Sequence, residues 1–362
     1  MHVLHVVGAR PNFMKAAPVL RALGAHSGHS QTLVHTGQHY DAGMSEVFFQ
    51  QLEMQEPDCN LGVGSGSHAQ QTAAVMVALE PVLAERCPDL VLVYGDVNST
   101  VAAALVCAKL GVRVGHVEAG LRSRDRSMPE EINRLLTDQL SDLLFTPSAD
   151  ADENLQREGI DPARIHLVGN VMIDTLARLL PRAEERLPAN LAKPYVLVTL
   201  HRPANVDDLS WLRGLLATLA DLSGRIEVIF PVHPRTRQRL DALGSLPGES
   251  GRVRLLEPLP YLEFLALERH AAFVITDSGG IQEETTFLGV PCLTVRENTE
   301  RPITIIQGTN RLAGKDLQRL HAMAEETIVN IQKENTQPCR VPLWDGHAAE
   351  RIAQIVLRDG RN

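Results

Sequence analysis

The chain has 362 residues, of which 44% are hydrophobic, 22% charged and 4% aromatic. This length exceeds what one ordinary core organises, so we expect two domains of similar size. The formal net charge of −9 argues against a nucleic-acid groove, and the apolar runs are too short to span a membrane. The first residues become polar too early for a secretory signal, which favours a cytoplasmic location.

Strand-like runs alternate with helix-like runs through the first half of the chain. Strands are predicted at residues 2–7, 31–36, 90–94, 112–117, 143–146 and 164–168, and helical periodicity fills the gaps, as at 69–85 and 100–111. Short β-branched strands separated by helices of ten or more residues indicate a parallel sheet covered by helices on both faces.

Residues 181–195 (PRAEERLPANLAKPY) contain prolines without a clear apolar period, which indicates a hinge between domains. The alternation then restarts, with strands predicted at residues 195–200, 226–232, 253–258, 271–277 and 290–295. Open parallel sheets bind ligands at the carboxyl ends of their strands. We therefore expect one ligand shared by two domains, bound by residues that directly follow strands.

In the first half, charged residues follow the predicted strands. Arg10 and Lys15 come after the first strand, and Asp96 comes after the strand at 90–94. Glu118 ends another apolar strand, where a buried charge needs a partner or a function. Glu130 opens a predicted helix. The alternatives are solvated turn charges for the cations, helix capping for the segment of Asp96, and dipole partners for the acids of the helix.

In the second half, His201 and Arg202 follow one predicted strand and His233 follows another. The segment FVITDSGGIQEE (residues 273–284) is predicted to be a strand, a Ser-Gly-Gly corner and a helix N-terminus, which together favour an anion such as phosphate. Its glutamates could instead be first-turn dipole partners. With Arg301, these groups predict an anion-binding wall.

Several classes of cofactor lack support in the sequence. A G-x-G-x-x-G pattern and a Walker A pattern are both missing, so nicotinamide and P-loop nucleotides are not expected. The five cysteines are scattered without a C-x-x-C pair, so we expect neither disulfides nor a metal site.

Eight motifs resemble, in their order and approximate spacing, those of the non-hydrolysing UDP-N-acetylglucosamine 2-epimerases. They are GARP with Lys15, GDVNST, HVEAGLRS, PEEINR, the His-Arg pair at 201–202, PVHP, TDSGGIQEE and TERP. The resemblance runs from residue 1 to about residue 357.

The resemblance implies an isomerase with an α/β fold of GT-B type, in which two Rossmann-like, doubly wound parallel-sheet domains face a central cleft. Residues 1–180 would carry the acid/base carboxylates, residues 190–345 would bind UDP, and the helix at 346–357 would pack back on the first domain. The implied reaction is the non-hydrolysing 2-epimerisation of a UDP-2-acetamido sugar, UDP-N-acetylglucosamine to UDP-N-acetylmannosamine. UDP is eliminated to leave a bound 2-acetamidoglucal and is then re-added, and the product would serve cell-surface polysaccharide precursor synthesis. A homodimer without cofactor or metal is also implied.

The resemblance assigns roles residue by residue. The implied catalytic residues are Asp96, Glu118, Glu130 and His201. The implied substrate-binding residues are Arg10, Lys15, Phe264, Ser278, Gly279, Gly280, Glu284 and Arg301, with Glu284 on the ribose and Phe264 on the uracil. A second UDP-N-acetylglucosamine, acting as a regulator, would use Gln38, Glu131, Arg202 and His233, or these residues have structural roles alone.

Three positions depart from the commonest family motifs: Asn12, Tyr94 and Ala204. The segment TGQHYDAGMS resembles a subgroup that includes 2-epimerases of UDP-2,3-diacetamido-2,3-dideoxyglucuronic acid, so this substrate is one alternative. Hydrolysing 2-epimerases, GT-B glycosyltransferases and catalytically silent UDP-sugar sensors are the others. The presence of Asp96, Glu118 and Glu130 argues against a glycosyltransferase and against a catalytically silent sensor.

Overall fold

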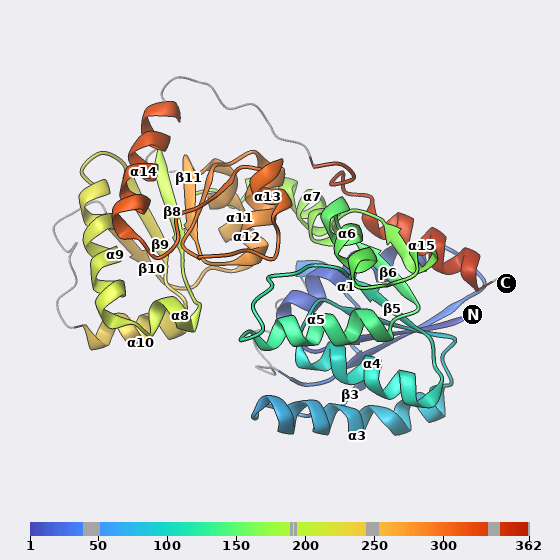
Figure 1. Cartoon of the computed structure of the whole chain (residues 1–362). Coiled ribbons are helices and arrows are strands. Elements are labelled where there is room, and N and C mark those ends of the chain that lie inside the picture. The colour runs from blue at the N-terminus through green and yellow to red at the C-terminus, as the bar shows by residue number, and fades with distance from the viewer. Residues whose placement is uncertain (39–50, 189–190, 192–193, 244–252, 332–340, 361–362) are drawn as a thin grey trace. The chain divides into compact units, whose positions relative to one another are not determined.

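The computed structural model describes residues 1–38, 51–188, 191, 194–243, 253–331 and 341–360. The chain forms two compact units (Figure 1). Unit 1 comprises Met1–Leu176 and Pro342–Asn362, and unit 2 comprises Ala177–Val341. Among the described residues, none of the helices combines the length and apolar character that a bilayer crossing needs.

Unit 1 is built on a parallel sheet with the strand order β3-β2-β1-β4-β5-β6-β7. Its strands are β1 (His2–Val7), β2 (Ser30–His35), β3 (Cys59–Asn60), β4 (Leu90–Tyr94), β5 (Val114–Val117), β6 (Leu143–Thr146) and β7 (Ile165–Leu167). The order reverses between β1 and β4. In open α/β sheets, ligands bind outside the carboxyl ends of the strands at such a switch point.

Helices cover both faces of this sheet. Figure 1 shows α3 (His68–Arg86), α4 (Asn98–Leu110) and α5 (Pro129–Leu140) on one face, and α1 (Arg10–Gly24) and α15 (Ala348–Asp359) on the other. Further helices are α6 (Ala149–Arg157), the 3-10 turn η1 (Pro162–Arg164) and α7 (Val171–Glu184). Since both faces are covered, β4 is apolar and buried at every position.

Unit 2 repeats the design with the strand order β10-β9-β8-β11-β12-β13. Its strands are β8 (Tyr195–Thr199), β9 (Glu227–Pro231), β10 (Val253–Leu256), β11 (Phe273–Thr276), β12 (Cys292–Thr294) and β13 (Asn310–Leu312). The switch point here lies between β8 and β11, so the residues after these two strands are best placed to meet a ligand.

Two layers of helices enclose this second sheet. Figure 1 shows α9 (Leu209–Leu222) and α14 (Leu317–Ile331) on one face, with α11 (Tyr261–His270) and α12 (Gly279–Leu288) on the other. The shorter helices are α8 (Pro203–Val206), α10 (Pro234–Ala242) and α13 (Ile303–Ile306). The apolar core between α9, α14 and the strands is continuous.

The strands predicted from apolar runs are all present, but two short strands were not predicted. These are β3 and β13, whose sequences Cys-Asn and Asn-Arg-Leu carry almost no apolar signal. The predicted hinge at 181–195 needs a correction, because α7 continues through Pro181 to Glu184. Its first residues are therefore helical, and residues 189–190 and 192–193 lie outside the described residues.

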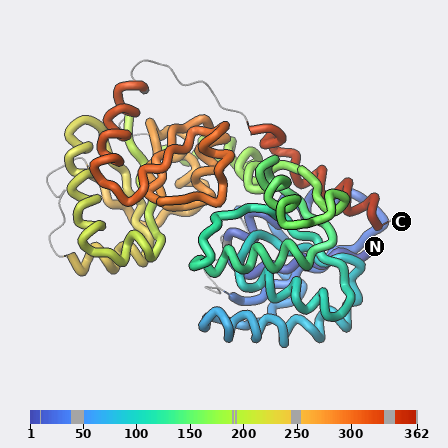
Figure 2. The backbone as a smooth tube through the Cα atoms, viewed as in Figure 1, coloured from blue at the N-terminus to red at the C-terminus, as the bar shows by residue number. Residues whose placement is uncertain are grey.

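The segment after Val341 belongs to unit 1, where α15 packs against α1 and its end lies beside the first residues of β1 (Figure 2). Asp174 on α7 accepts hydrogen bonds from the first N–H groups of α15, those of Ala348 (3.1 Å) and Ala349 (2.7 Å). Burial raises the pKa of Asp174 to about 6, although these two N–H groups oppose the rise. Asp174 thus links the stability of unit 1 to pH.

Asp174→Asn is expected to remove this pH dependence. The folded pKa of about 6 exceeds the unfolded value of about 3.9, so the contribution of the aspartate is full below about pH 4 and is lost as pH rises through 6. The difference in unfolding free energy between the two proteins should change by up to about 3 kcal/mol across this window. Urea titrations followed by Trp344 fluorescence in a Trp211→Phe background measure unit 1; a pH-independent difference would contradict the assignment.

Candidate active site

The residue Asn12 ties the loop after β1 to the end of β4. Its Oδ1 accepts hydrogen bonds from the N–H groups of Gly8 (3.0 Å) and Ala9 (3.1 Å), and its Nδ2 donates to the Tyr94 carbonyl (2.7 Å). The N-terminus of α1 is therefore fixed at the switch point of the sheet. Arg10 is the first residue of α1, and its side chain lies outside the described part of the structure.

Glu118 follows β5 with a φ of 73°, a conformation that non-glycine residues adopt rarely. Its N–H and that of Ala119 both donate to the Phe145 carbonyl, at 3.1 and 3.0 Å. The buried carboxylate is ion-paired with Lys15, at 2.7 Å between Oε2 and Nζ. Lys15 in turn packs against Gly95, where an added Cβ would lie 2.7 Å from Nζ. The sheet edge therefore holds this carboxylate and this ammonium in one fixed arrangement.

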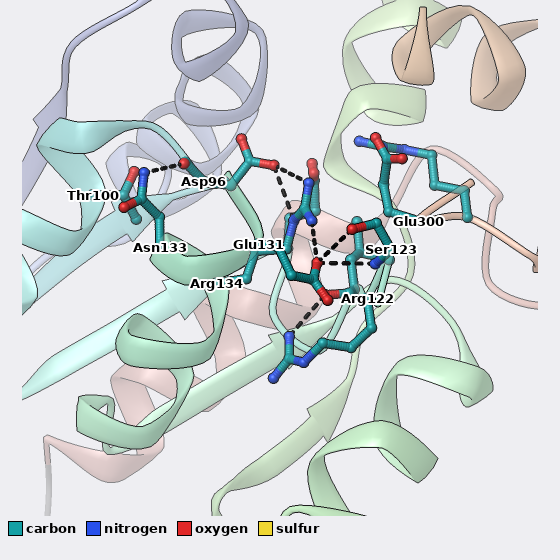
Figure 3. Close-up of polar contacts among 12 residues, drawn as sticks. Asp96, Thr100, Arg122, Ser123, Glu131, Asn133, Arg134 and Glu300 are labelled. Carbon is teal, nitrogen blue, oxygen red and sulfur yellow. Dashed lines mark hydrogen bonds and ion pairs between the residues drawn. The ribbon is translucent and has the colours of Figure 1, made fainter. Parts of the chain in front are cut away.

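Arg134 on α5 holds two acidic residues at once (Figure 3). Its Nη2 and Nε donate to Asp96 Oδ2 at 2.6 and 3.0 Å, and its Nη1 donates to Glu131 Oε2 at 2.6 Å. Glu131 also accepts from the Ser123 N–H (2.9 Å), the Ser123 hydroxyl (3.0 Å) and the Arg124 N–H (2.9 Å). Both oxygens of Glu131 are therefore engaged inside unit 1, while one oxygen of Asp96, Oδ2, accepts two donors of the same arginine.

A cavity of about 250 Å³ lies at this edge of the unit 1 sheet. Asp96, Glu130 and Gln38 line it, together with Ser65, Gly66, His68, Gln71, Val97, Asn98, Pro129 and Asn133. The cavity brings together two of the three predicted catalytic carboxylates and one residue predicted for the regulatory site. Glu118 is not among the described residues that line it, and instead pairs with Lys15.

A buried ionic network lies beneath these loops. One ring nitrogen of His116 lies 2.6 Å from Asp138 Oδ1, and the other lies 2.8 Å from the Gly95 carbonyl oxygen. Asp138 Oδ2 is ion-paired with Arg122 (2.7 Å) and accepts the Gly120 N–H (3.1 Å). Burial opposes ionisation of Asp138, but His116 and Arg122 outweigh it and hold the pKa of that carboxyl below its usual value.

In unit 2, Asp277 organises the residues that follow β8. Its carboxylate accepts the N–H groups of His201 (3.1 Å) and Arg202 (3.0 Å) and the side-chain amide of Asn205 (3.1 Å). The His201 ring approaches it at 3.2 Å and lies 5.7 Å from the ring of His233, the exposed N-cap of α10. The structure therefore brings His201, Arg202 and His233 to one edge of this sheet.

The Ser-Gly-Gly corner starts α12, with Ser278 at the N-cap. A larger residue at Gly279 would displace the ion pair of Arg301 and Glu300, because an added Cβ would lie 2.6 Å from Arg301 Nη1 and 2.9 Å from Glu300 Oε1. Arg301 Nη1 donates to Glu300 Oε1 (2.7 Å), and its Nε is ion-paired with Glu283 Oε1 (2.9 Å). Gly280 is the next residue of the helix. The start of a helix beside a buried arginine is an arrangement that suits an anion.

Two further arginines lie close to Glu300. Arg296 Nη2 pairs with Glu300 Oε2 at 2.7 Å, and Arg202 Nη2 lies 3.5 Å from Glu300 Oε1. Burial, with the nearby arginine charges, lowers the pKa of Arg202. Three guanidinium groups therefore lie near the Ser-Gly-Gly corner. They provide the local positive charge that an anionic ligand needs in a protein with a net negative charge.

The two glutamates of the corner have separate partners, and neither lies in the first turn of α12, which corrects the alternative that they are first-turn dipole partners. Glu283 is ion-paired with Arg301, and Glu284 accepts a hydrogen bond from the Tyr261 hydroxyl (2.9 Å). Phe264 is half-buried on α11, the helix that also carries Tyr261.

Comparisons with known proteins agree with this architecture. The sequence model of the UDP-N-acetylglucosamine 2-epimerase family matches residues 21–357. The chain is 42% identical over 363 residues to the UDP-N-acetylglucosamine 2-epimerase of Methanococcus maripaludis, covering 97% of both chains. It is 39% identical over 361 residues to the UDP-2,3-diacetamido-2,3-dideoxy-D-glucuronate 2-epimerase of Pseudomonas aeruginosa, covering 99% of this chain and 100% of that protein. The chain belongs to the UDP-N-acetylglucosamine 2-epimerase family.

A solved structure extends the likeness of this epimerase to three dimensions. The crystal structure of the Methanocaldococcus jannaschii UDP-GlcNAc 2-epimerase in complex with UDP-GlcNAc and UDP has a TM-score of 0.89 and 39% sequence identity, covering 99% of this chain and 100% of that one. The GT-B-type fold class with two Rossmann-like parallel sheets is therefore confirmed. The roles of the individual site residues stay predictions.

The sequence did not single out the residues that hold the candidate side chains of this epimerase. Asp277 ends the apolar strand β11 as Glu118 ends β5, so the same signal could have found it. Arg134 and Asp138 gave no such signal. Each contacts a partner on another element, and Arg134 lies 38 residues from Asp96 in the sequence.

Proposed function

We propose that this epimerase interconverts UDP-N-acetylglucosamine and UDP-N-acetylmannosamine without hydrolysing them. The observation that carries the proposal is Glu118, a buried carboxylate at positive φ, ion-paired with Lys15 at the switch-point edge of the unit 1 sheet. Backbone strain and buried charge of this kind are concentrated at functional sites. The relatives named UDP-N-acetylglucosamine 2-epimerase support the choice of substrate class.

In this proposal the two units divide the work. Unit 1 supplies the carboxylates for proton transfer, namely Asp96, Glu118 and Glu130. Unit 2 binds UDP: the phosphates at Ser278, Gly279, Gly280 and Arg301, the ribose at Glu284 and the uracil at Phe264. His201, Lys15 and Arg10 would stabilise the charge on the departing diphosphate.

The proposed reaction is an elimination followed by the reverse addition. A carboxylate takes the proton from C-2, the C–H electron pair forms the C-1–C-2 double bond, and the C-1–O bond breaks with its electrons on the UDP oxygen. The bound 2-acetamidoglucal then accepts a proton at C-2 from the opposite face while UDP adds back to C-1. Coupling the weakly acidic proton to loss of a stabilised diphosphate avoids a free carbanion, and each placed carboxylate contributes typically about 10²- to 10⁴-fold.

A second substrate deserves a direct comparison. The Pseudomonas aeruginosa relative is named for UDP-2,3-diacetamido-2,3-dideoxy-D-glucuronate, and it is nearly as similar to this chain as the UDP-N-acetylglucosamine relatives are. The TGQHYDAGMS segment also favours it, although residues 39–45 lie outside the described residues. A uronate carboxylate that entered the unit 1 cavity would meet Asp96 and Glu130, so the cavity favours the neutral sugar.

Incubation with UDP-N-acetylglucosamine in deuterated water is expected to give both the gluco and the manno nucleotides with deuterium at C-2. Mass spectrometry and NMR of the nucleotide pool measure this, and the same assay with the diacetamido uronic acid nucleotide compares the two substrates. Glu153→Gln is the control, because Glu153 is an exposed acid of unit 1 paired only at the surface with Arg157.

The outcomes separate the alternatives. Intact nucleotide without deuterium would contradict the proposal for that sugar. Free UDP formed in proportion to N-acetylmannosamine would instead identify a hydrolysing 2-epimerase.

Three finer features complete the proposal. The chain would act as a cytoplasmic homodimer, and its product would feed cell-surface polysaccharide precursor synthesis. A second UDP-N-acetylglucosamine would regulate it through Gln38, Glu131, Arg202 and His233. Of these four residues, Glu131 has both carboxylate oxygens bound within unit 1, so a structural role is the competing explanation for it.

A further inference from the structure

Two buried carboxyl groups meet between α11 and α12 in unit 2. Glu268 has none of its surface exposed, and Glu284 has 3%. The two side chains are within hydrogen-bonding reach of each other, and Glu284 Oε1 accepts the Tyr261 hydroxyl at 2.9 Å. Glu268 is therefore fully enclosed, whereas Glu284 keeps a small exposed surface.

Hydrogen-bond donors are scarce around this pair. Both oxygens of Glu268 and Oε2 of Glu284 are buried without a donor among the residues that the structure describes. Ionised carboxylates only accept hydrogen bonds, so two of them side by side can be satisfied only if one carries a proton. A single proton on Glu268 would supply the donor that Glu284 Oε2 lacks.

Electrostatics favour the same state. Among the residues that the structure describes, the titratable groups that act on the pair are the Tyr261 hydroxyl of α11 and the Cys292 thiol of β12, and burial raises the pKa of both. β11, which packs against α12, presents the apolar sequence Phe-Val-Ile-Thr. Burial and the neighbouring carboxyl also raise the pKa of Glu268 well above its usual value, and burial raises that of Glu284. Two like charges so placed cannot both be ionised at neutral pH.

We propose that Glu268 is a positioning residue that shares one proton with Glu284 and thereby holds the Glu284 carboxylate ready for the hydroxyl groups of a ribose. Tyr261 donates to Oε1 and protonated Glu268 donates to Oε2. The Tyr261 hydroxyl leaves a further acceptor position on Oε1, whereas Oε2 is buried, so Oε1 is the oxygen that would accept a ribose hydroxyl. The inference rests on the proposed function, which assigns the ribose of UDP to Glu284.

The proposal predicts how the affinity for UDP depends on pH. When alkali removes the shared proton, two adjacent negative charges repel, and UDP should bind at least about tenfold more weakly than at neutral pH. Glu268→Gln keeps the size of the side chain and a permanent donor but cannot ionise. Its dissociation constant for UDP should stay within about twofold of wild type at neutral pH and should not rise in alkali.

The test uses the full chain and two independent measurements. Calorimetric titration with UDP from about pH 6 to pH 9 compares wild type, Glu268→Gln and the control Glu326→Gln, an exposed glutamate of α14 paired with Arg311. Infrared spectroscopy without ligand looks at neutral pH for the carbonyl band of a protonated carboxylic acid. The band should be present in wild type and Glu326→Gln and lost in Glu268→Gln.

Each measurement has a result that would overturn the proposal. A carboxylic acid band that survives in Glu268→Gln, or an unchanged alkaline loss of UDP affinity in that variant, would overturn the shared proton. Wild-type chain that shows the band but does not bind UDP would overturn the ribose role together with the proposed function. The two failures are distinguishable, because the infrared measurement needs no nucleotide.

Discussion

Glu118→Gln is expected to lower the rate of deuterium exchange at C-2 by about 10²- to 10⁴-fold while the chain still binds UDP. Glutamine has the shape of glutamate but cannot take the proton. The backbone of Glu118 is fixed by its positive φ and by the Phe145 carbonyl, so the exchange should not be rescued by a rearranged side chain. The Lys15 ammonium, 2.7 Å away in wild type, would lose its anionic partner.

Exchange is measured in deuterated water, and UDP binding is measured by calorimetry on the same preparation. Asp96→Asn and Glu130→Gln form the companion set, and we expect both to bind UDP and lose exchange. Glu153→Gln on the surface of unit 1 should behave as wild type. Near-normal turnover in all three site variants would remove the assignment of these carboxylates.

Asp138→Ala is expected to destabilise unit 1 by about 3–5 kcal/mol, the typical cost of breaking a buried ion pair by removing one partner. The substitution leaves the buried His116 without its carboxylate at 2.6 Å and leaves the Gly120 N–H without an acceptor. Arg122 keeps Glu158, at 2.6 Å, as its second partner. Urea unfolding followed by Trp344 fluorescence in a Trp211→Phe background reports on unit 1.

The pH dependence of the destabilisation by Asp138→Ala provides a control for this prediction. Because the folded pKa of Asp138 lies below its usual value, its contribution is present above about pH 3.9 and is lost as pH falls through the folded pKa. The gap between wild type and Asp138→Ala should therefore narrow in acid. Glu153→Ala breaks an exposed pair and should cost less than about 1 kcal/mol, so an equal loss in both variants would contradict a special role for the buried network.

The architecture was predictable because its signal is local. Apolar runs such as LVLVY, which is buried at every position of β4, indicate strands of a sheet that is covered on both faces. The helices between these strands indicate parallel pairing. The residues that follow the strands could be predicted as candidate site residues, because the carboxyl ends of parallel strands lie at one edge of the sheet. β3 and β13 escaped because two or three largely polar residues pair only where a neighbouring strand offers its edge.

The partners of the candidate residues could not be predicted because they depend on long-range packing. Lys15 meets Glu118 across about a hundred residues of sequence, and Glu268 meets Glu284 from a different helix. A helical pattern places Glu268 in α11 but does not reveal that its carboxyl group lacks a donor. The family resemblance supplied the candidate roles, and the structure shows which partners hold each of these side chains.

The division of unit 1 into two segments affects the order in which the protein can fold during synthesis. Unit 2 is one uninterrupted stretch, Ala177–Val341, so all of its strands leave the ribosome before α15 does. Unit 1 completes the capping of Asp174 only when α15 arrives, after the whole of unit 2. The domain whose translation begins first is therefore finished last.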